Sequence, residues 1–302
     1  MTQAPSGEQV EIAHDDQRAV IVEVGGGLRS YSAGDRDVLD GYGPDEMCLS
    51  GRGQVLMPWP NRLEDGSYRF DGRDHQLPLS EPANRNAIHG LVRWASWRVA
   101  ERDPARVVME HVIRPQPGYP FTVGLAIEYA LSDLGLSVRS TATNLGETRC
   151  PFGAGAHPYV KLDASTVDAL SLHVPAASVS YSGERSLPNG STSVDGTEFD
   201  FRRPRQVGSL KLDNCFSELD RDGDGRVRVG IHDPSGRSVI VWAGEGYDYL
   251  MVFSGDPLPD VARRSIAVEP MTCPPNAFRS GESVIALEPG AAFTAEWGIE
   301  CI

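Results

Sequence analysis

The clearest constraint on the fold is a strict two-residue alternation of apolar side chains near the middle of the chain. From Phe121 to Leu131 every second residue is apolar, a turn follows at 132–135 (SDLG), and the alternation resumes over 136–142. A period of two is typical of a strand with one buried face. Two such runs around a short turn predict an antiparallel hairpin that packs one face on the core.

Strand patterns recur along the chain, and no stretch has a sustained helical period. The 32 glycines and 22 prolines mark turns throughout. We therefore expect an all-β protein, a large antiparallel β-sandwich formed by a single domain at 17–302, with 1–16 as a flexible lead-in. The other predicted strands are 19–24, 106–113, 237–242, 249–253, 284–287 and 292–299, and the long irregular loops are 43–66, 71–94, 145–160 and 255–282.

Charge and cysteine content argue against several classes of partner and site. The 42 acidic and 28 basic residues give a formal net charge of −14, which disfavours binding to nucleic acid or an anionic membrane. Five scattered cysteines without a CxxC pair argue against a disulfide framework and a zinc site. With no apolar leader or membrane-length apolar run, the cytoplasm is the expected compartment.

Three titratable residues stand in segments rich in glycine and proline. They are His89, His157 and Glu269, in the segments 86–91 (NAIHGL), 153–159 (GAGAHPY) and 269–276 (EPMTCPPN). Imidazole and carboxylate groups exchange protons readily near neutral pH, and glycine and proline fix backbone turns that aim a side chain. The three residues suggest proton-transfer chemistry without a cofactor.

Each of these side chains also has an ordinary explanation. An isolated histidine in a β protein is usually structural, but the small residues before His157 leave room for a ligand beside its ring. Glu269 follows the apolar run 265–268, so we expect it at a strand end, where burial at the sheet rim would strengthen it as a base. A solvated glutamate at that strand end is the alternative.

Other motifs have weaker functional interpretations. Asn61 and Arg62 follow two prolines, and the arginine fork suits hydroxyl or carboxylate oxygens, although a simple salt bridge explains it equally well. The acidic run 220–225 (DRDGDG) resembles the start of a calcium loop but has Ile231 at the twelfth position, so a polar hairpin turn is the better explanation. Four tryptophans are candidates for stacking on a sugar or for the core: Trp59, Trp94, Trp97 and Trp242.

Taken together, five segments in this order resemble the aldose 1-epimerase (mutarotase) family, in particular its galactose mutarotase-like bacterial members. The segments are 53–62 (GQVLMPWPNR), 89–97 (HGLVRWASW), 157–159 (HPY), 212–216 (LDNCF) and 269–272 (EPMT). The resemblance covers about residues 20–299 and implies the galactose mutarotase-like supersandwich. That fold agrees with the strand pattern read from the residues.

The resemblance also implies roles for individual residues. It makes Glu269 the general base and His157 the general acid, and it places His89, Arg62 and Asp213 at the sugar's hydroxyls and ring, with Asn61 beside Arg62. Asp213 has no local signal of its own and is included on the resemblance alone. The implied reaction exchanges the α and β anomers of a free aldohexose through the open-chain aldehyde, and it needs no metal or cofactor.

Three alternatives remain open at this stage. A hexose-6-phosphate 1-epimerase of the same fold would need a basic cluster, for which Arg62, Arg85 and Arg93 are candidates. A non-catalytic carbohydrate-binding or sugar-sensing protein would keep the pocket without needing both His157 and Glu269. A lyase or hydrolase is disfavoured because no second catalytic carboxylate is placed. The expected partner is a monosaccharide, and the expected assembly is a monomer or homodimer.

Overall fold

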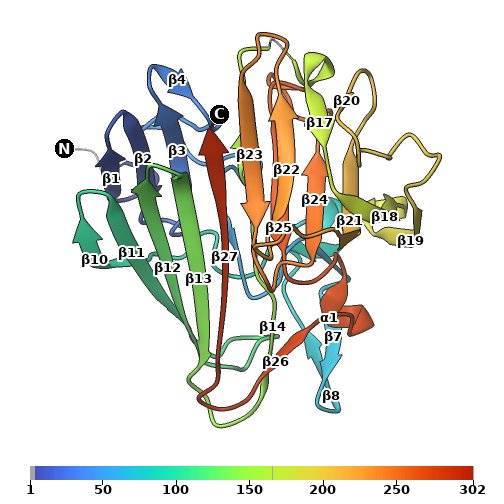
Figure 1. Cartoon of the computed structure of the whole chain (residues 1–302). Helices are drawn as coiled ribbons and strands as arrows, with labels where there is room; N and C mark the ends of the chain where they lie inside the picture. The colour runs from blue at the N-terminus through green and yellow to red at the C-terminus, as the bar shows by residue number, and fades with distance from the viewer. Residues whose placement is uncertain (1–3, 165, 302) are drawn as a thin grey trace.

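The computed structural model describes residues 4–164 and 166–301, and nearly all of its regular structure is β-strand (Figure 1). Two large antiparallel sheets form the body of the molecule. The nine-stranded sheet contains, in spatial order, β10 (Arg98–Asp103), β11 (Arg106–Ile113), β12 (Val123–Ser132), β13 (Gly135–Asn144), β27 (Ala292–Cys301), β23 (Ser238–Ala243), β22 (Val227–His232), β17 (Ser171–His173) and β20 (Arg205–Gln206).

The second large sheet has eight strands and positions the candidate site. Its order is β19 (Pro188–Ser193), β18 (Ala176–Ser182), β21 (Asp213–Leu219), β24 (Tyr249–Phe253), β25 (Ile266–Met271), β15 (Gly155–Ala156) and β5 (Val55–Leu56), and β16 (Tyr159–Val160) also pairs with β25. Both β15 and β16 pair with β25, and they are counted as two short strands because residues 157–158 interrupt the pairing.

Smaller sheets and short helices complete the fold. The four-stranded sheet is β1 (Gln9–His14), β2 (Gln17–Val22), β3 (Leu28–Ala33) and β4 (Arg36–Asp37), and the two-stranded ones pair β6 (Arg62–Glu64) with β9 (Asn86–Ile88), β7 (Ser67–Phe70) with β8 (Arg73–Gln76), and β14 (Cys150–Phe152) with β26 (Ile285–Leu287). The helix α1 (Ala277–Ser280) is one turn long, and three 3-10 turns occupy Pro82–Asn84, Val167–Ala169 and Glu184–Ser186.

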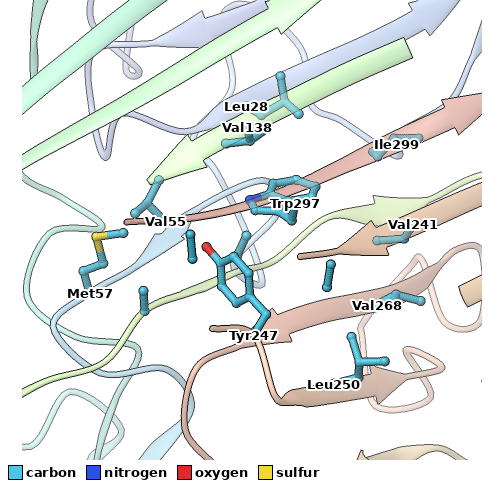
Figure 2. Close-up of a cluster of buried hydrophobic side chains, with 14 of the residues drawn as sticks. Leu28, Val55, Met57, Val138, Val241, Tyr247, Leu250, Val268, Trp297 and Ile299 are labelled. Atoms are coloured by element: carbon cyan, nitrogen blue, oxygen red, sulfur yellow. The ribbon is translucent and has the colours of Figure 1, made fainter. Parts of the chain in front are cut away.

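The core lies between the two large sheets. Figure 2 shows Val138, Val241 and Trp297 of the nine-stranded sheet close to Leu250 and Val268 of the eight-stranded sheet. All five side chains are buried. Each such side chain contributes roughly 1.5–3 kcal/mol by leaving water, so this interface is the main source of stability.

The predicted fold class is confirmed, and so is the hairpin that predicted it. Strands β12 and β13 pair antiparallel from Val123 opposite Asn144 to Ser132 opposite Gly135. The predicted strands 106–113 and 249–253 coincide with β11 and β24, while the others shift by one or two residues at their ends. The acidic run 220–225 is the predicted turn, since Asp222 and Asp224 each accept a hydrogen bond from Arg228 at 2.7 Å.

Some predicted boundaries are wrong. The flexible lead-in at 1–16 is contradicted at 9–14, where β1 pairs with β2 and buries Val10 and Ile12. Val10 and Ile12 alternate too briefly to predict a strand, since the opposite face has Gln9, Glu11 and the small Ala13; residues 1–3 lie outside the described part of the chain. The predicted long loops 43–66, 71–94, 145–160 and 255–282 contain several short strands and α1.

Two further expectations concern cysteines and membrane spans. All five cysteines are free thiols in the structure, and four of them are buried. None of the helices in residues 4–164 and 166–301 has the length and apolar character needed to cross a bilayer.

Candidate active site

The register of the eight-stranded sheet places His157 directly opposite Glu269. Strand β25 pairs with β15 at Gly155–Met271 and with β16 at Tyr159–Ala267. Both pairings belong to one antiparallel register, in which each step forward on one strand is a step back on the other. Residue 157 therefore faces residue 269, although 112 residues separate them (269 − 157).

The same register assigns side chains to the two faces of this sheet. Along β25, Ile266 and Val268 point into the core between the sheets, so Glu269 lies on the opposite face. Cross-strand pairing extends the Glu269 face to neighbouring strands, where Phe253 pairs with Asp213. The face that turns away from the sandwich core therefore carries His157, Glu269 and Asp213 together.

The prediction that Glu269 lies at a strand end is wrong. Glu269 lies inside β25, which spans Ile266–Met271. The strand continues through Pro270 to Met271. Val268 N–H donates to Pro158 O at 3.2 Å and Thr272 N–H donates to Ala154 O at 2.9 Å. By this two-residue repeat the N–H of residue 270 would point toward Ala156, and Pro270 has none, so the ladder lacks one bond beside His157.

His157 and Glu269 form a buried contact at the floor of the site. Their Nε2 and Oε1 atoms are 3.3 Å apart, and the two side chains are 6% and 3% exposed. No hydrogen-bond partner among the described residues reaches His157 Nδ1 or Glu269 Oε2. Because unpaired buried polar atoms are costly, these two atoms are suited to hydrogen bonds with a polar ligand.

Burial sets the charge state of this pair. It raises the pKa of the Glu269 carboxyl well above its usual range, and the nearby Asp213 adds to the rise while Arg62 opposes it. Burial also lowers the pKa of His157 to about 3, with a smaller contribution from the Arg93 charge. Both directions favour a neutral pair that holds one exchangeable proton between the carboxyl and the imidazole.

His89 reaches the site through a strained loop. Its φ is 61°, and Gly90 follows at 73°, where a Cβ would lie 1.9 Å from Met57 O. The Asn61 backbone N–H donates to His89 Nδ1 at 3.1 Å, and His89 N–H donates back to Asn61 O at 2.9 Å. Since a backbone N–H can only donate, the neutral His89 ring carries its proton on Nε2 and is a donor there.

A stacked arrangement holds the His157 ring. Tyr159 lies parallel to it, with centroids 4.8 Å apart and planes 8° apart, and the Arg52 guanidinium lies 4.7 Å from the Tyr159 centroid. The edge of the ring packs against Gly51, whose φ is 76° and where a Cβ would lie 2.8 Å from His157 Cδ2. The ring is thus fixed from its flat face and from its edge.

The small residues before His157 were predicted to leave room for a ligand beside its ring, but they pack against other chain segments. A Cβ on Gly153 would lie 2.6 Å from Cys273 Sγ, and one on Gly155 would lie 2.9 Å from the Pro60 Cβ. These glycines let neighbouring chain segments approach closely, so they do not make room for a ligand.

The remaining predicted residues also reach the site, with differing freedom. Arg62 donates from Nε and Nη2 to the Glu81 carboxylate at 3.0–3.2 Å, so the salt bridge offered as its alternative does form. Asn61 is buried, and its Oδ1 accepts from the Arg62 backbone N–H. Burial raises the pKa of Asp213, which lines the same pocket.

These residues line a pocket of about 450 Å³ on the outer face of the eight-stranded sheet. All six predicted site residues lie in its wall: His157, Glu269, His89, Asn61, Arg62 and Asp213. The pocket is also lined by residues outside the predicted set, among them Gly51, Asn84, Tyr159, Ser186, Phe253, Pro257 and Leu258. Tyr159 belongs to the HPY segment of the family resemblance, and this is its one sequence signal.

Of the four candidate tryptophans, only Trp94 is in a position to stack on a ligand. It is 54% exposed and lines the pocket, whereas Trp59, Trp97 and Trp242 are buried. Beside it in the sequence, Arg93 also lines the pocket.

A comparison with known families assigns the chain as a whole. Residues 8–300 match the family model described as aldose 1-epimerase. The chain belongs to the aldose 1-epimerase family. The family resemblance stated from the five sequence segments is thereby confirmed.

Individual proteins are similar to this chain in sequence or in fold. The Escherichia coli K12 protein YihR, described as uncharacterized, is 34% identical over 286 residues, which are 94% of this chain and 90% of YihR. Human galactose mutarotase is 26% identical over 239 residues, covering 72% of this chain and 68% of its own length. The GalM/aldose epimerase homologue from C. elegans matches the fold with a TM-score of 0.87 over 98% of both chains, at 19% identity.

Proposed function

We propose that this protein is an aldose 1-epimerase that interconverts the α and β anomers of a free aldohexose, with Glu269 as general base and His157 as general acid. The supporting observation is the buried contact of 3.3 Å between these two side chains, on the pocket wall and opposite each other in the sheet. Aldose 1-epimerase and galactose mutarotase are also the names of relatives at 26% identity.

The reaction requires two proton transfers at neighbouring oxygens. A base removes the proton of the C1 hydroxyl while an acid protonates the ring oxygen, and the C1–O5 bond breaks to give the aldehyde. Rotation about C1–C2 presents the other face, and the reverse transfers close the ring. Because both oxygens are bonded to C1, an acid and a base separated by one short contact can reach both of them.

Other side chains in the wall have positioning roles in this scheme. His89 offers its Nε2–H to a sugar oxygen because Nδ1 accepts from Asn61 N–H. Arg62 is held by Glu81 through Nε and Nη2, which leaves Nη1 for a sugar hydroxyl. The orientation of both donors is therefore set before the sugar binds, and donors fixed in this way stabilise charge that develops during ring opening.

The active form of the pair contains one exchangeable proton. The carboxylate–imidazolium form and the neutral form contain the same number of protons, so they are two arrangements of one titration state. Hydrogen bonds from sugar hydroxyls to the Glu269 carboxylate favour the charged arrangement, in which His157 is the acid.

The expected dependence of kcat on pH follows from the pKa shifts of His157 and Glu269. Acid inactivation requires a second proton on His157, whose pKa burial lowers to about 3, and alkaline inactivation requires loss of the shared proton from Glu269, whose pKa burial raises. We therefore expect kcat to stay level between pH 7 and pH 5, where an exposed histidine would titrate. A loss of kcat with a midpoint near pH 6.5, in protein that remains folded, would contradict this charge state.

The same side chains have the composition of a metal site, but their hydrogen bonding does not suit one. His89, His157 and Glu269 each bring one ligand atom to within 4.8 Å of the others. His89 Nδ1 is occupied by the Asn61 N–H, and its Nε2 carries the proton, so neither nitrogen offers a lone pair in this geometry. We expect the epimerase rate to survive EDTA; a loss restored by added Zn²⁺ or Ca²⁺ would show that a metal is required.

Polarimetry on freshly dissolved α-D-glucose and α-D-galactose tests the proposed function. The protein should accelerate relaxation of the optical rotation without changing its final value. If folded protein accelerates neither sugar nor an acidic or phosphorylated aldose, a carbohydrate-binding role would replace the proposal. The hexose-6-phosphate alternative receives limited support, because Arg62 and Arg85 are engaged by Glu81 and Asp65.

A further inference from the structure

The turn that joins β18 to β19, at 183–187, combines an unfavourable backbone with a place in the pocket wall. Arg185 has φ 62° and ψ 17°, and Ser186 follows with φ 54°. Consecutive non-glycine residues in the left-handed region are uncommon, and they persist only where the surrounding contacts hold them. Ser186 is half-buried and lines the same pocket as His157 and Glu269. The chain therefore accepts backbone strain where it brings this serine to the pocket.

The Arg185 side chain fastens this turn to distant loops. Its Nε donates to Asn84 O at 2.7 Å, and its Nη2 donates to Arg85 O at 2.7 Å. The same Nη2 donates to Asp65 Oδ1 at 2.9 Å, and the Asn86 amide donates back to Arg185 O at 2.9 Å. These contacts join residues that are 99–120 positions apart in the sequence. They hold the strained conformation from both the side chain and the backbone of Arg185.

Two further hydrogen bonds tie the turn to residues proposed to bind the sugar. The Asn86 amide also donates to Glu81 Oε2 at 2.9 Å, and the Glu81 carboxylate is the partner of Arg62. Just before the turn, Ser182 Oγ donates to Asp213 O at 2.9 Å. The turn is therefore connected to two walls of the pocket, one through the Arg62–Glu81 pair and the other through the backbone of Asp213.

We propose that Ser186 is a specificity-determining residue that binds one ring hydroxyl of the sugar, and that Arg185 is the positioning residue that holds it there. This inference rests on the proposed function, in which Glu269 and His157 act at C1 and the ring oxygen, so the rest of the wall faces the hydroxyls at C2, C3 and C4. Within 4–164 and 166–301, no side chain or backbone group hydrogen bonds to Ser186 Oγ. A free serine hydroxyl can donate and accept, as a sugar hydroxyl does.

The first test is Ser186→Gly, because glycine adopts a positive φ readily and the variant loses only the hydroxymethyl group. Catalysed anomer exchange is measured for D-glucose or D-galactose, whichever the wild type exchanges faster, and for the 2-, 3- and 4-deoxy analogues of that sugar. We expect kcat/KM for the parent sugar to fall by about 3- to 10-fold, as for one hydrogen bond, with a melting temperature at or above that of the wild type. One deoxy analogue should show no such fall, because it lacks the hydroxyl that Ser186 binds.

A matched control separates the hydroxyl from the backbone. Ser283 also has a positive φ, 53°, but it is exposed and does not line the pocket. Ser283→Gly should therefore leave kcat/KM unchanged for the parent sugar and for its deoxy analogues.

The role of Arg185 is tested with a double-mutant cycle. Arg185→Gln should lower kcat/KM for the parent sugar by at least the factor of Ser186→Gly, and adding Ser186→Gly to it should cause no further loss, since Arg185 acts through the serine. Losses that multiply in folded protein overturn the positioning role. The Ser186→Gly result decides the hydroxyl contact even where Arg185→Gln does not fold.

The outcomes separate this inference from the proposed function. An unchanged kcat/KM in folded Ser186→Gly, or an equal fall with the parent sugar and all three deoxy analogues, overturns the inference and leaves the proposed function standing. A folded wild type that exchanges the anomers of neither sugar overturns both.

Discussion

Glu269→Gln is expected to lower kcat by about 10²–10⁴-fold, because the amide keeps the shape of the side chain but cannot accept the C1 hydroxyl proton. Sugar binding should persist, since the amide oxygen still accepts a hydrogen bond. The measurement is catalysed anomer exchange at saturating sugar, together with a direct binding titration. Turnover within a few-fold of the wild type would contradict the assignment of Glu269 as the base.

The stability of this variant provides the control. Burial raises the pKa of Glu269, so in the unfolded chain the carboxyl ionises above its ordinary pKa of about 4.5 while the folded protein resists ionisation. The wild type therefore loses stability as the pH rises from 4.5 through the raised pKa, and the neutral glutamine does not. We expect Glu269→Gln to have a free energy of unfolding at neutral pH equal to or above that of the wild type.

His157→Asn is expected to lower kcat by about 10²–10⁴-fold while changing the sugar affinity much less. The asparagine side chain can hydrogen bond to a sugar oxygen but cannot release a proton to it near neutral pH. Single-turnover exchange separates the chemical step from binding. A variant with unchanged kcat and a raised KM would make His157 a binding residue.

The pH dependence of unfolding separates a loss of chemistry from a loss of structure in this variant. Burial lowers the pKa of His157 to about 3, so the unfolded chain takes up a proton below pH 6.5 that the folded protein refuses. The wild type should therefore lose stability as the pH falls from 6.5 toward 3, and His157→Asn should lose less over the same range. His89, whose pKa is also lowered by burial, remains in both proteins.

The fold class could be predicted from the sequence because the two-residue alternation of apolar side chains identifies a strand and its buried face. The hairpin of β12 and β13 shows this most clearly, since its apolar positions are the ones that the structure buries. The strand β1 was missed because two apolar residues in a polar segment form too short a pattern. The predicted strand ends at Glu269 because its apolar run covers only 265–268, whereas β25 continues through Pro270 to Met271.

The candidate site could be predicted from the sequence only in part. His157 and Glu269 were found separately from their glycine- and proline-rich segments, but their opposition depends on a sheet register between distant strands. Asp213 came from the family resemblance, because an acid at the start of a strand has no local signal. The link between Asn61 and His89 and the pairing of Arg62 with Glu81 are tertiary contacts between separate loops.

The central claim is that the His157–Glu269 pair interconverts sugar anomers, and two-dimensional exchange NMR at equilibrium tests it most directly. With the wild type, cross-peaks between the α and β anomeric protons of glucose or galactose should grow in proportion to protein concentration. With Glu269→Gln, folded and at the same concentration, they should fall to the spontaneous level. Equal cross-peaks for the two proteins, or none above the spontaneous level with either sugar, would contradict the account.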